Sequence, residues 1–202
     1  EMVIQRYLQL QLLVEQVTQD NGEVGVREIF QHLSRLQLLT CTRQGLKGVE
    51  RLNSLIRQGL ARKLGISAEA THYNGRPIMI TENAYHLNLY NGDIGVQLID
   101  PFTGQLTSYF LMPDASVYKL FCQRLPAHDS VYAMTVHKSQ GSEFEHTVLI
   151  LDGESSRLSR ELFYTGVTRA KSQFSLLADK KSIEQAVVNQ TRRQSGLAAM
   201  LK

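Results

Sequence analysis

Two short polar segments hold the side chains most suited to chemistry on phosphates. Residues 137–144 read HKSQGSEF and follow an apolar run over 131–136, and residues 164–171 read YTGVTRAK and precede an apolar run over 174–178. The second segment contains Arg169. A guanidinium group stays charged at physiological pH and can bridge two oxygens, so an arginine beside a bound phosphate can stabilise the charge that develops during phosphoryl transfer.

Arg169 is the candidate catalytic residue of the chain. We expect a helix over 159–170, on which Glu161, Thr165 and Arg169 would share one face because residues four apart are neighbours. An arginine that reaches a transferred phosphoryl group is worth about 10³ to 10⁵ in rate. The alternative interpretation is an ordinary surface arginine before a basic helix end, with Lys171 beside it.

The first segment offers groups that can contact a nucleotide or a nucleic acid. Gln140 can donate and accept hydrogen bonds, Gly141 lets the backbone approach a ligand closely, and Glu143 can accept from ribose hydroxyls. His137 can donate to a phosphate or a base. Short hydroxyl donors suited to phosphate contacts lie in the same stretch, at Thr135 and Ser139. The alternative is a polar loop between a strand and a helix.

The sequence lacks the parts that a self-sufficient ATPase needs. It has no Gly-Lys dipeptide and therefore no G-x-x-x-x-G-K-[ST] phosphate loop. Residues 148–154, VLILDGE, resemble a strand that ends in a magnesium-binding acid, but without that loop we interpret Asp152 as a turn residue. The six histidines show no metal-ligand spacing, so no metal site is predicted. We expect this chain to hydrolyse no ATP by itself.

Charge is distributed unevenly along the 202 residues, whose formal net charge is +3. Basic residues dominate 35–63 and 160–202, and acidic residues dominate 73–159. Two basic segments that flank an acidic one favour a polyanion-binding surface built from distant parts of the chain, and we expect the basic residues of 35–63 on the same side as His137. The alternative is a set of solvated helix faces.

Composition excludes several other classes of protein. The hydrophobic fraction of 43% is typical of a globular chain with one domain or two small ones. No apolar run is long enough for a transmembrane helix, and the first residues do not form a signal peptide, so we expect a cytoplasmic protein. Cys41 and Cys122 are predicted to be free, buried thiols. The opening Glu1-Met2 indicates a piece of a longer chain.

Hydrophobic periodicity predicts an α/β unit interrupted by an all-β insertion. Helices are expected over 4–17, around 26–33, through 49–60, over 159–170 and over 182–189. Strands of the α/β unit are expected over 36–42, 77–81, 131–136, 147–151 and 173–178. Between them, strands over 94–99, 106–111 and 117–121 are separated only by turn residues, which is typical of a small antiparallel barrel.

These segments together resemble a known family. Residues 75–83 (GRPIMITEN), 89–95 (LYNGDIG), 124–144, 160–171 and 195–201 (SGLAAML) resemble the C-terminal part of the RecD family of superfamily 1B helicases, the alpha chains of exodeoxyribonuclease V. The resemblance covers the chain from about residue 36 onward. It implies a RecA-like parallel-sheet motor domain, 2A, at 1–91 and 129–202, and an SH3-like β-barrel, 2B, at 92–128.

The resemblance also implies roles for single residues. Arg169 would be the arginine finger, and Gln140, Gly141 and Glu143 would lie on the nucleotide side. Residues that would face DNA are Thr135, His137 and Asn83. The family often has Asn-Asp where this chain has Asn83-Ala84.

The implied activity belongs to a longer protein. It is movement along single-stranded DNA in the 5′-to-3′ direction, driven by ATP with Mg²⁺, in a double-strand-break repair enzyme with two further subunits. The first motor domain with its phosphate loop is absent from this chain. The alternatives are another superfamily 1B helicase, conjugative or phage, and a non-catalytic module that docks a protein partner.

Overall fold

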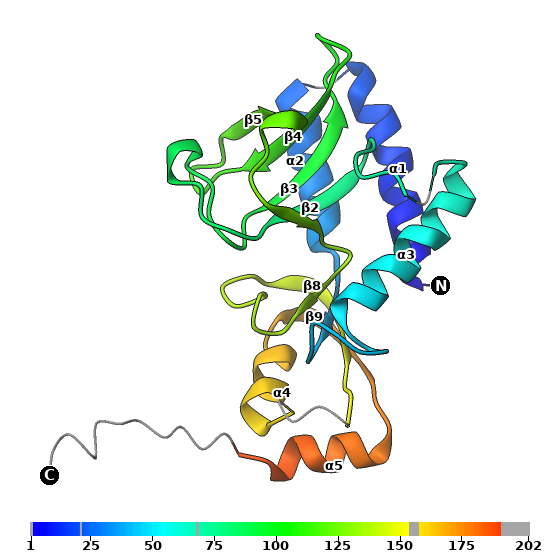
Figure 1. Ribbon diagram of the computed structural model, residues 1–202, viewed down its shortest axis with the longest axis vertical. Coiled ribbons are helices and arrows are strands. Elements are labelled where there is room, and N and C mark those ends of the chain that lie inside the picture. Colours follow the sequence, from blue (N-terminus) through cyan, green and yellow to red (C-terminus); the bar gives the residue numbers. More distant parts are fainter. Residues whose placement is uncertain (1, 21, 68, 154–157, 191–202) are drawn as a thin grey trace, which may run out of the picture.

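Two β-sheets joined by helices make up the structure. The computed structural model describes residues 2–20, 22–67, 69–153 and 158–190, with side chains described outside 17–20. The predicted basic tail and the SGLAAML segment lie outside these ranges. Figure 1 shows one sheet above the other, with the N-terminal helices beside the upper sheet and the last two helices beside the lower one.

The lower sheet is parallel and carries both polar segments. Its strand order is β7-β1-β8-β9, and every ladder in it is parallel. The strands are β1 (Leu36–Thr40), β7 (Ala133–Thr135), β8 (Phe144–Ile150) and β9 (Ala170–Leu177). All five residues of β1 are buried, as expected for a central strand covered on both faces. The predicted α/β class is confirmed.

The upper sheet is antiparallel and includes strands outside the insertion predicted at 92–128. Its order is β5-β4-β3-β2-β6, with β2 (Arg76–Ile80), β3 (Ile94–Ile99), β4 (Leu106–Leu111), β5 (Val117–Phe121) and β6 (His128–Ser130). Strands β3, β4 and β5 have the predicted bounds. Strand β2, which we expected in the α/β unit, pairs instead with β3 and β6. This pairing on both sides makes β2 an interior strand, and all five of its residues are buried.

In the described ranges, five α-helices pack around these sheets. They are α1 (Met2–Asp20), α2 (Gly22–Ser34), α3 (Val49–Leu64), α4 (Arg160–Val167) and α5 (Lys180–Val188), with 3₁₀ turns at Tyr85–Leu87 and Cys122–Arg124. Helices α1 and α2 pack on each other and against β3 and β4, α3 contacts β7, and α4 contacts α5, β8 and β9. Side chains cap two N-termini: Ser159 accepts from the Leu162 amide at 3.3 Å, and Asp179 from the Ser182 amide at 2.7 Å.

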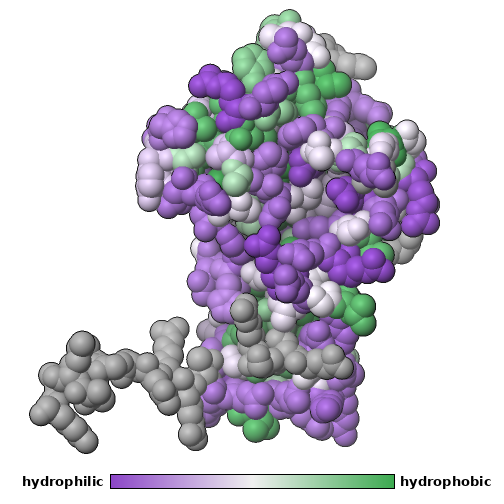
Figure 2. Space-filling view, viewed as in Figure 1, coloured by the Kyte–Doolittle hydropathy of each residue, from purple (hydrophilic) through white to green (hydrophobic). Residues whose placement is uncertain are grey.

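A continuous core joins the two sheets. One buried cluster combines residues of α1, α2, α3, β1, β3 and β8, and in it the rings of Tyr7 and Tyr132 meet edge to face at 4.8 Å. Cys41 and Cys122 are both free and buried, as predicted. The face in Figure 2 is hydrophilic over much of its area, with hydrophobic residues gathered over the antiparallel sheet. Among the described helices, none is long and apolar enough to span a membrane.

The chain crosses from the upper to the lower sheet between residues 128 and 135. The strand predicted at 131–136 is present but shorter, as β7 in the parallel sheet, and β6 precedes it in the antiparallel sheet. Asn53 of α3 holds this crossing, because its amide donates to the Ser130 and Ala133 carbonyls at 2.8 and 3.2 Å and accepts from the Ala133 N–H at 2.7 Å. A side chain on a distant helix therefore fixes the start of β7.

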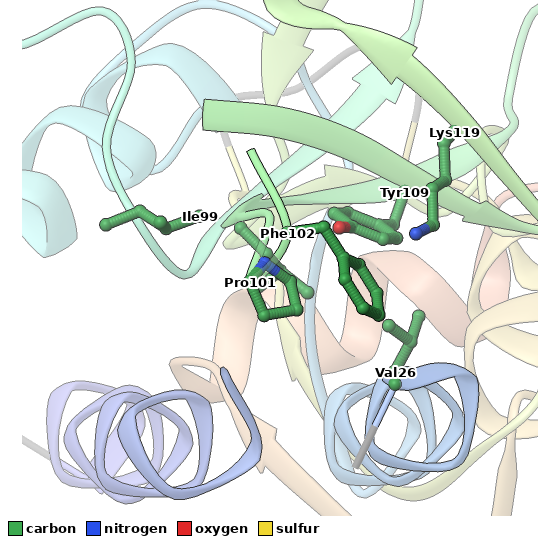
Figure 3. Close-up of a pocket in the computed structure, with 8 residues that line it drawn as sticks. Val26, Ile99, Pro101, Phe102, Tyr109 and Lys119 are labelled. Atoms are coloured by element: carbon green, nitrogen blue, oxygen red, sulfur yellow. The ribbon is translucent and has the colours of Figure 1, made fainter. Parts of the chain in front are cut away.

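The turn between β3 and β4 is organised by one buried carboxylate. Asp100 accepts from the Tyr109 hydroxyl at 2.8 Å and from the backbone amides of Phe102 and Thr103 at 3.0 Å each, and Lys119 lies 3.3 Å away. Burial opposes ionisation, but these hydrogen bonds outweigh it and lower the pKa of Asp100 to about 2. Figure 3 shows the small pocket between this turn and α2, where Phe102 points toward Val26.

Candidate functional site

The first polar segment forms the connection between β7 and β8. The connection leaves the carboxyl end of β7, where the Val136 amide donates to the Thr40 carbonyl of β1 at 3.0 Å, and it enters the amino end of β8. Because the two strands are parallel, this connection runs the length of the sheet. Its first residues therefore lie at the carboxyl edge of the sheet and its last residues at the amino edge.

Most of the predicted ligand-binding side chains in this connection are exposed. His137, Gln140, Gly141 and Glu143 are all exposed, and Thr135 is half-buried with its hydroxyl accepting from the Lys138 amide at 3.3 Å. Gly141 has a φ of 87°, in the left-handed region that favours glycine. The backbone thus turns sharply where Gln140 and Gly141 meet solvent, and both are free to contact a ligand.

Ser139 does not have the expected role. Its side chain is fully buried, and its hydroxyl donates to the Val136 carbonyl at 2.8 Å. The Ser139 amide also lies within hydrogen-bonding distance of the Thr135 carbonyl, at 3.2 Å. Ser139 therefore holds the turn together from inside and is not placed to contact a phosphate.

Arg169 lies outside the helix on which it was predicted. Helix α4 ends at Val167 and β9 begins at Ala170, so Arg169 occupies the turn between them. The predicted helix through 170 is wrong because Ala170 pairs with Phe144, and this strand pairing replaces the last helical turn. Arg169 still lies next to Thr165, as expected, because the Arg169 Nε donates to the Thr165 carbonyl at 3.2 Å.

The guanidinium of Arg169 ties the two polar segments together. Its Nη1 donates to the Ser142 carbonyl at 3.0 Å, and its Nη2 lies 3.3 Å from the Thr168 hydroxyl. The backbone repeats the link, because the Phe144 amide donates to the Arg169 carbonyl at 2.8 Å. A guanidinium has five N–H donors, and three have partners among the described residues. Two remain for a ligand at the amino edge of the sheet.

A glycine lets helix α4 lie close to the sheet. Gly166 is buried, and a Cβ at this position would lie 3.0 Å from Leu149 Cδ2 and 3.5 Å from Val136 Cγ2. Leu149 belongs to β8, and Val136 begins the connection that carries His137. The glycine of YTGVTRAK therefore sets the distance between α4 and the first polar segment, and with it the position of Arg169.

The predicted DNA-facing residue Asn83 is linked to the same connection from the antiparallel sheet. Its side-chain oxygen accepts from the Asn91 amide at 2.9 Å, and the Lys138 amine donates to the Asn91 side-chain oxygen. Asn83 is thereby placed two hydrogen bonds from the residue that follows His137. No local sequence pattern indicates the contact between Asn91 and Lys138.

The basic residues of 35–63 do not lie at one edge. Arg43 and Lys47 follow the carboxyl end of β1, on the side where His137 lies, whereas Arg35 precedes the amino end, and its carbonyl accepts from the His146 amide at 3.0 Å. The expectation of a single side is therefore wrong for Arg35. Two of the carboxyl-edge cations are already paired: Arg43 with Glu50 at 3.0 Å and Asp129 at 3.6 Å, and Lys47 with Asp179 at 3.9 Å.

Acidic and metal-ligating groups do not cluster here. Over the described ranges, no three His, Cys, Asp or Glu side chains lie close enough to hold a metal ion. Asp152 follows the end of β8, half-buried, in the strand-end position that we predicted for it. The arrangement thus offers an arginine, exposed polar groups and backbone amides, which are the groups that recognise phosphates.

Part of the chain matches a known domain family. The UvrD-like helicase C-terminal domain matches residues 130–177, a range that contains both polar segments. Among solved structures, a Pif1 helicase from Bacteroides in complex with ADP-AlF3 and single-stranded DNA resembles the chain with a TM-score of 0.48 and 15% identity, covering 98% of this chain and 51% of that one.

Sequence relatives are more specific. The RecBCD enzyme subunit RecD of Haemophilus influenzae is 42% identical over 170 residues, which cover 83% of this chain and 25% of that protein. The RecD subunit of Mycolicibacterium smegmatis is 37% identical over 177 residues, covering 87% and 31%. The chain thus spans about a quarter to a third of the length of these relatives. The resemblance inferred from the motifs is confirmed: over most of its length this chain is a RecD-like helicase sequence.

Proposed function

We propose that this chain is the C-terminal motor half of an ATP-dependent translocase that moves 5′ to 3′ on single-stranded DNA within a double-strand-break repair helicase–nuclease. The relatives are named as subunits of the RecBCD enzyme, which supports a subunit of a larger enzyme. We propose two partner subunits and a location in the cytoplasm. The parallel sheet would be the RecA-like domain 2A. The antiparallel sheet would be the SH3-like unit 2B, with limits moved outward from 92–128 to include β2 and β6.

One observation carries this proposal: the Arg169 guanidinium joins the two helicase segments through the Ser142 carbonyl. The contact fixes the side chain at the amino edge of the parallel sheet and leaves two of its N–H donors free of partners in the described chain. In a two-domain motor, ATP binds between the halves. An arginine held in this way can reach the transferred phosphoryl group when the halves close, and it is pre-oriented for that step.

The neighbouring residues suit the nucleotide side of such a cleft. Gln140 can hydrogen-bond to a phosphate oxygen, the exposed backbone at Gly141 can approach the nucleotide closely, and Glu143 can accept from ribose hydroxyls. Mg²⁺ would neutralise phosphate charge, but the described residues do not form a metal site. We place its ligands in the other motor half, and no step here depends on it.

The same connection would couple ATP to DNA. His137, Thr135 and, through Asn91, Asn83 lie toward its carboxyl-edge end, and Ser142 and Arg169 lie at its amino-edge end. A shift at one end moves the other, because the buried Ser139 and the close contact at Gly166 leave the connection little room to deform alone. We infer that cleft closure is transmitted to the DNA track through this segment.

The test is the ATPase activity of the full-length protein with single-stranded DNA. Arg169→Ala should lower the turnover rate by about 10³ or more and leave nucleotide affinity close to normal, because the interaction is made mainly in the transition state. Arg160→Ala, which changes an exposed arginine at the start of helix α4, is the matched control and should behave as the wild type. Retention of more than about a tenth of the activity in Arg169→Ala would contradict the assignment.

A further inference from the structure

Two tyrosines next to the candidate DNA track are exposed without an evident folding role. Tyr85 is 70% exposed and Tyr90 is 47% exposed. Their rings lie 6.0 Å apart between centroids at an interplanar angle of 75°. Aromatic side chains carry large apolar surfaces, and a pair of them left in solvent marks a binding site more often than a single one does.

The backbone turn that carries these rings is well defined. Ala84 and Leu89 pair across the turn, with the Ala84 amide donating to the Leu89 carbonyl at 2.8 Å, and both side chains are buried. Asn88 takes a left-handed conformation, with a φ of 52°, to close the turn between the tyrosines. The left-handed Asn88 and the two buried anchors therefore define the backbone turn that carries both rings.

Polar contacts orient the pair and connect it to the candidate site. The Asn83 amide donates to the Tyr85 hydroxyl at 3.0 Å, and the Asp93 carboxylate accepts from the Tyr90 amide at 2.7 Å. The side-chain oxygen of Asn91, the residue after Tyr90, accepts a hydrogen bond from the Lys138 amine. The aromatic pair is therefore one residue away from a contact with the connection that carries His137.

The polar and charged side chains near Tyr85 and Tyr90 suit a nucleic-acid ligand. Lys138 and His137 lie on the linked connection, and exposed His86 lies between the two tyrosines in sequence. The exposed acid nearby is Glu82, while the Asp93 carboxylate is already engaged. Exposed rings beside a lysine suit single-stranded nucleic acid, because every base presents a stacking face and every linkage a phosphate.

We propose that Tyr85 and Tyr90 form a base-stacking platform for single-stranded DNA, with the His137–Lys138 segment contacting the backbone next to it. The inference rests on the proposed function, since it assumes that the strand runs over this connection, and it adds residues that hold the bases. Stacking requires no particular base, so the platform grips the strand at any sequence.

Phe102 supplies a matched control in the same sheet. It is 84% exposed, at the turn between β3 and β4, yet it has a role within the fold: Lys119 lies 5.7 Å from the centre of its ring, and the ring borders the pocket against α2. Figure 3 shows this arrangement. Among the residues that the structure describes, Phe102 forms no hydrogen bond or ring contact with the His137 connection, so its removal should not affect DNA binding.

The experiment compares a fluorescein-labelled oligo(dT) with an abasic oligodeoxynucleotide of equal length, bound to the full-length protein in an anisotropy titration. The abasic strand has the same phosphates and no bases. Tyr85→Ala and Tyr90→Ala should each weaken oligo(dT) binding about tenfold, equivalent to about 1.4 kcal/mol, and leave abasic binding unchanged. Tyr85→Phe and Tyr90→Phe should bind like the wild type, and so should Phe102→Ala.

Each outcome has one meaning. If the alanine variants bind oligo(dT) like the wild type, or lose affinity for both strands equally, the platform is overturned, and equal melting temperatures exclude misfolding. The proposed function is judged separately by DNA-stimulated ATPase of the wild-type protein. If ATPase is stimulated and the wild type binds both strands equally well, the platform fails and the function stands. If DNA does not stimulate ATPase but the alanine variants still lose affinity for oligo(dT) alone, the proposed function fails and the platform stands.

Discussion

The Nη1 of Arg169 donates to the carbonyl oxygen of Ser142 at 3.0 Å, across 27 residues of sequence. Ser142 ends the connection that begins beside His137, and Arg169 ends the turn after helix α4. The contact links the polar segment 137–144 directly to the polar segment 164–171. In the proposed function Arg169 has two tasks, since the same guanidinium that would meet a phosphate also holds Ser142 in place.

These two tasks predict the behaviour of a lysine at position 169. Arg169→Lys keeps the charge, but a single ammonium cannot reach the Ser142 and Thr165 carbonyls and also bridge two phosphate oxygens. We expect the ATPase rate of the full-length protein to stay within about tenfold of the Arg169→Ala rate, as measured in steady state. Near wild-type turnover in the lysine variant would show that charge alone is sufficient, and that the fork geometry has no role.

Gly166 should tolerate little added volume. A Cβ would lie 3.0 Å from Leu149, so the branched side chain of Gly166→Val must push α4 away from β8, at a cost of about 1 to 3 kcal/mol. Gly166→Ala should be closer to neutral, because its gain in helix propensity of about 1 kcal/mol offsets the close contact. Denaturant unfolding checks both, with Tyr164→Ala, exposed on the same helix, as the control. A valine variant as stable as the wild type would show that the helix is free to move.

Asp100 should make stability depend on acid pH. Its pKa is lowered to about 2 in the folded state, so the unfolded state binds a proton more readily. The stabilisation is therefore complete above the unfolded pKa of about 4 and is lost as the pH falls toward 2, amounting to at most about 2 kcal/mol. Asp100→Asn removes the titration, so the difference in unfolding free energy between wild type and variant should shrink between pH 5 and pH 2.

Asp114 provides the comparison for that measurement. Its carboxylate is exposed and, among the described residues, accepts only from Ser116 in its own turn, from the hydroxyl at 2.6 Å and from the amide at 3.0 Å. Asp114→Asn should change the pH dependence much less than Asp100→Asn. Equal pH profiles for the two variants would show that the buried network around Asp100 does not govern acid stability.

The sequence predicted features that depend on local patterns. The three strands β3, β4 and β5 have the expected bounds because turn residues delimit each of them. Arg169 and the residues of 137–143 could be singled out because their types and order are local as well. The α/β class followed from the alternation of apolar runs, which is set within each segment.

What could not be predicted depends on partners distant in sequence. Strand β2 joins the antiparallel sheet because β3 and β6 pair with it, and nothing within residues 76–80 indicates that choice. Arg169 leaves the helix because Ala170 pairs with Phe144, which overrides helical propensity. Asn53 and Asn91 act through contacts 80 and 47 residues away, so their roles appear only in three dimensions.

His137 should affect DNA coupling and spare the fold. The side chain is exposed, and its removal leaves the surrounding hydrogen bonds of Thr135 and Ser139 intact. His137→Ala should therefore keep the wild-type melting temperature and either bind single-stranded DNA more weakly or lose stimulation of ATPase by DNA. The two readouts are an anisotropy titration and a steady-state rate with and without oligo(dT). Unchanged affinity together with unchanged stimulation would remove His137 from the DNA track.

Lys138 should contribute to the salt dependence of DNA binding. The affinity of a protein for single strands falls with salt because each neutralised phosphate releases counterions, adding about 0.7 to the slope of log K against log salt. Lys138→Met should lower affinity at low salt and reduce that slope by about 0.7, because one cation leaves the connection beside His137. Lys180→Met, which removes an exposed cation from α5, should leave the slope unchanged. Equal slopes for Lys138→Met and the wild type would mean that the Lys138 amine serves only to hold Asn91, and that the backbone of the strand is contacted elsewhere.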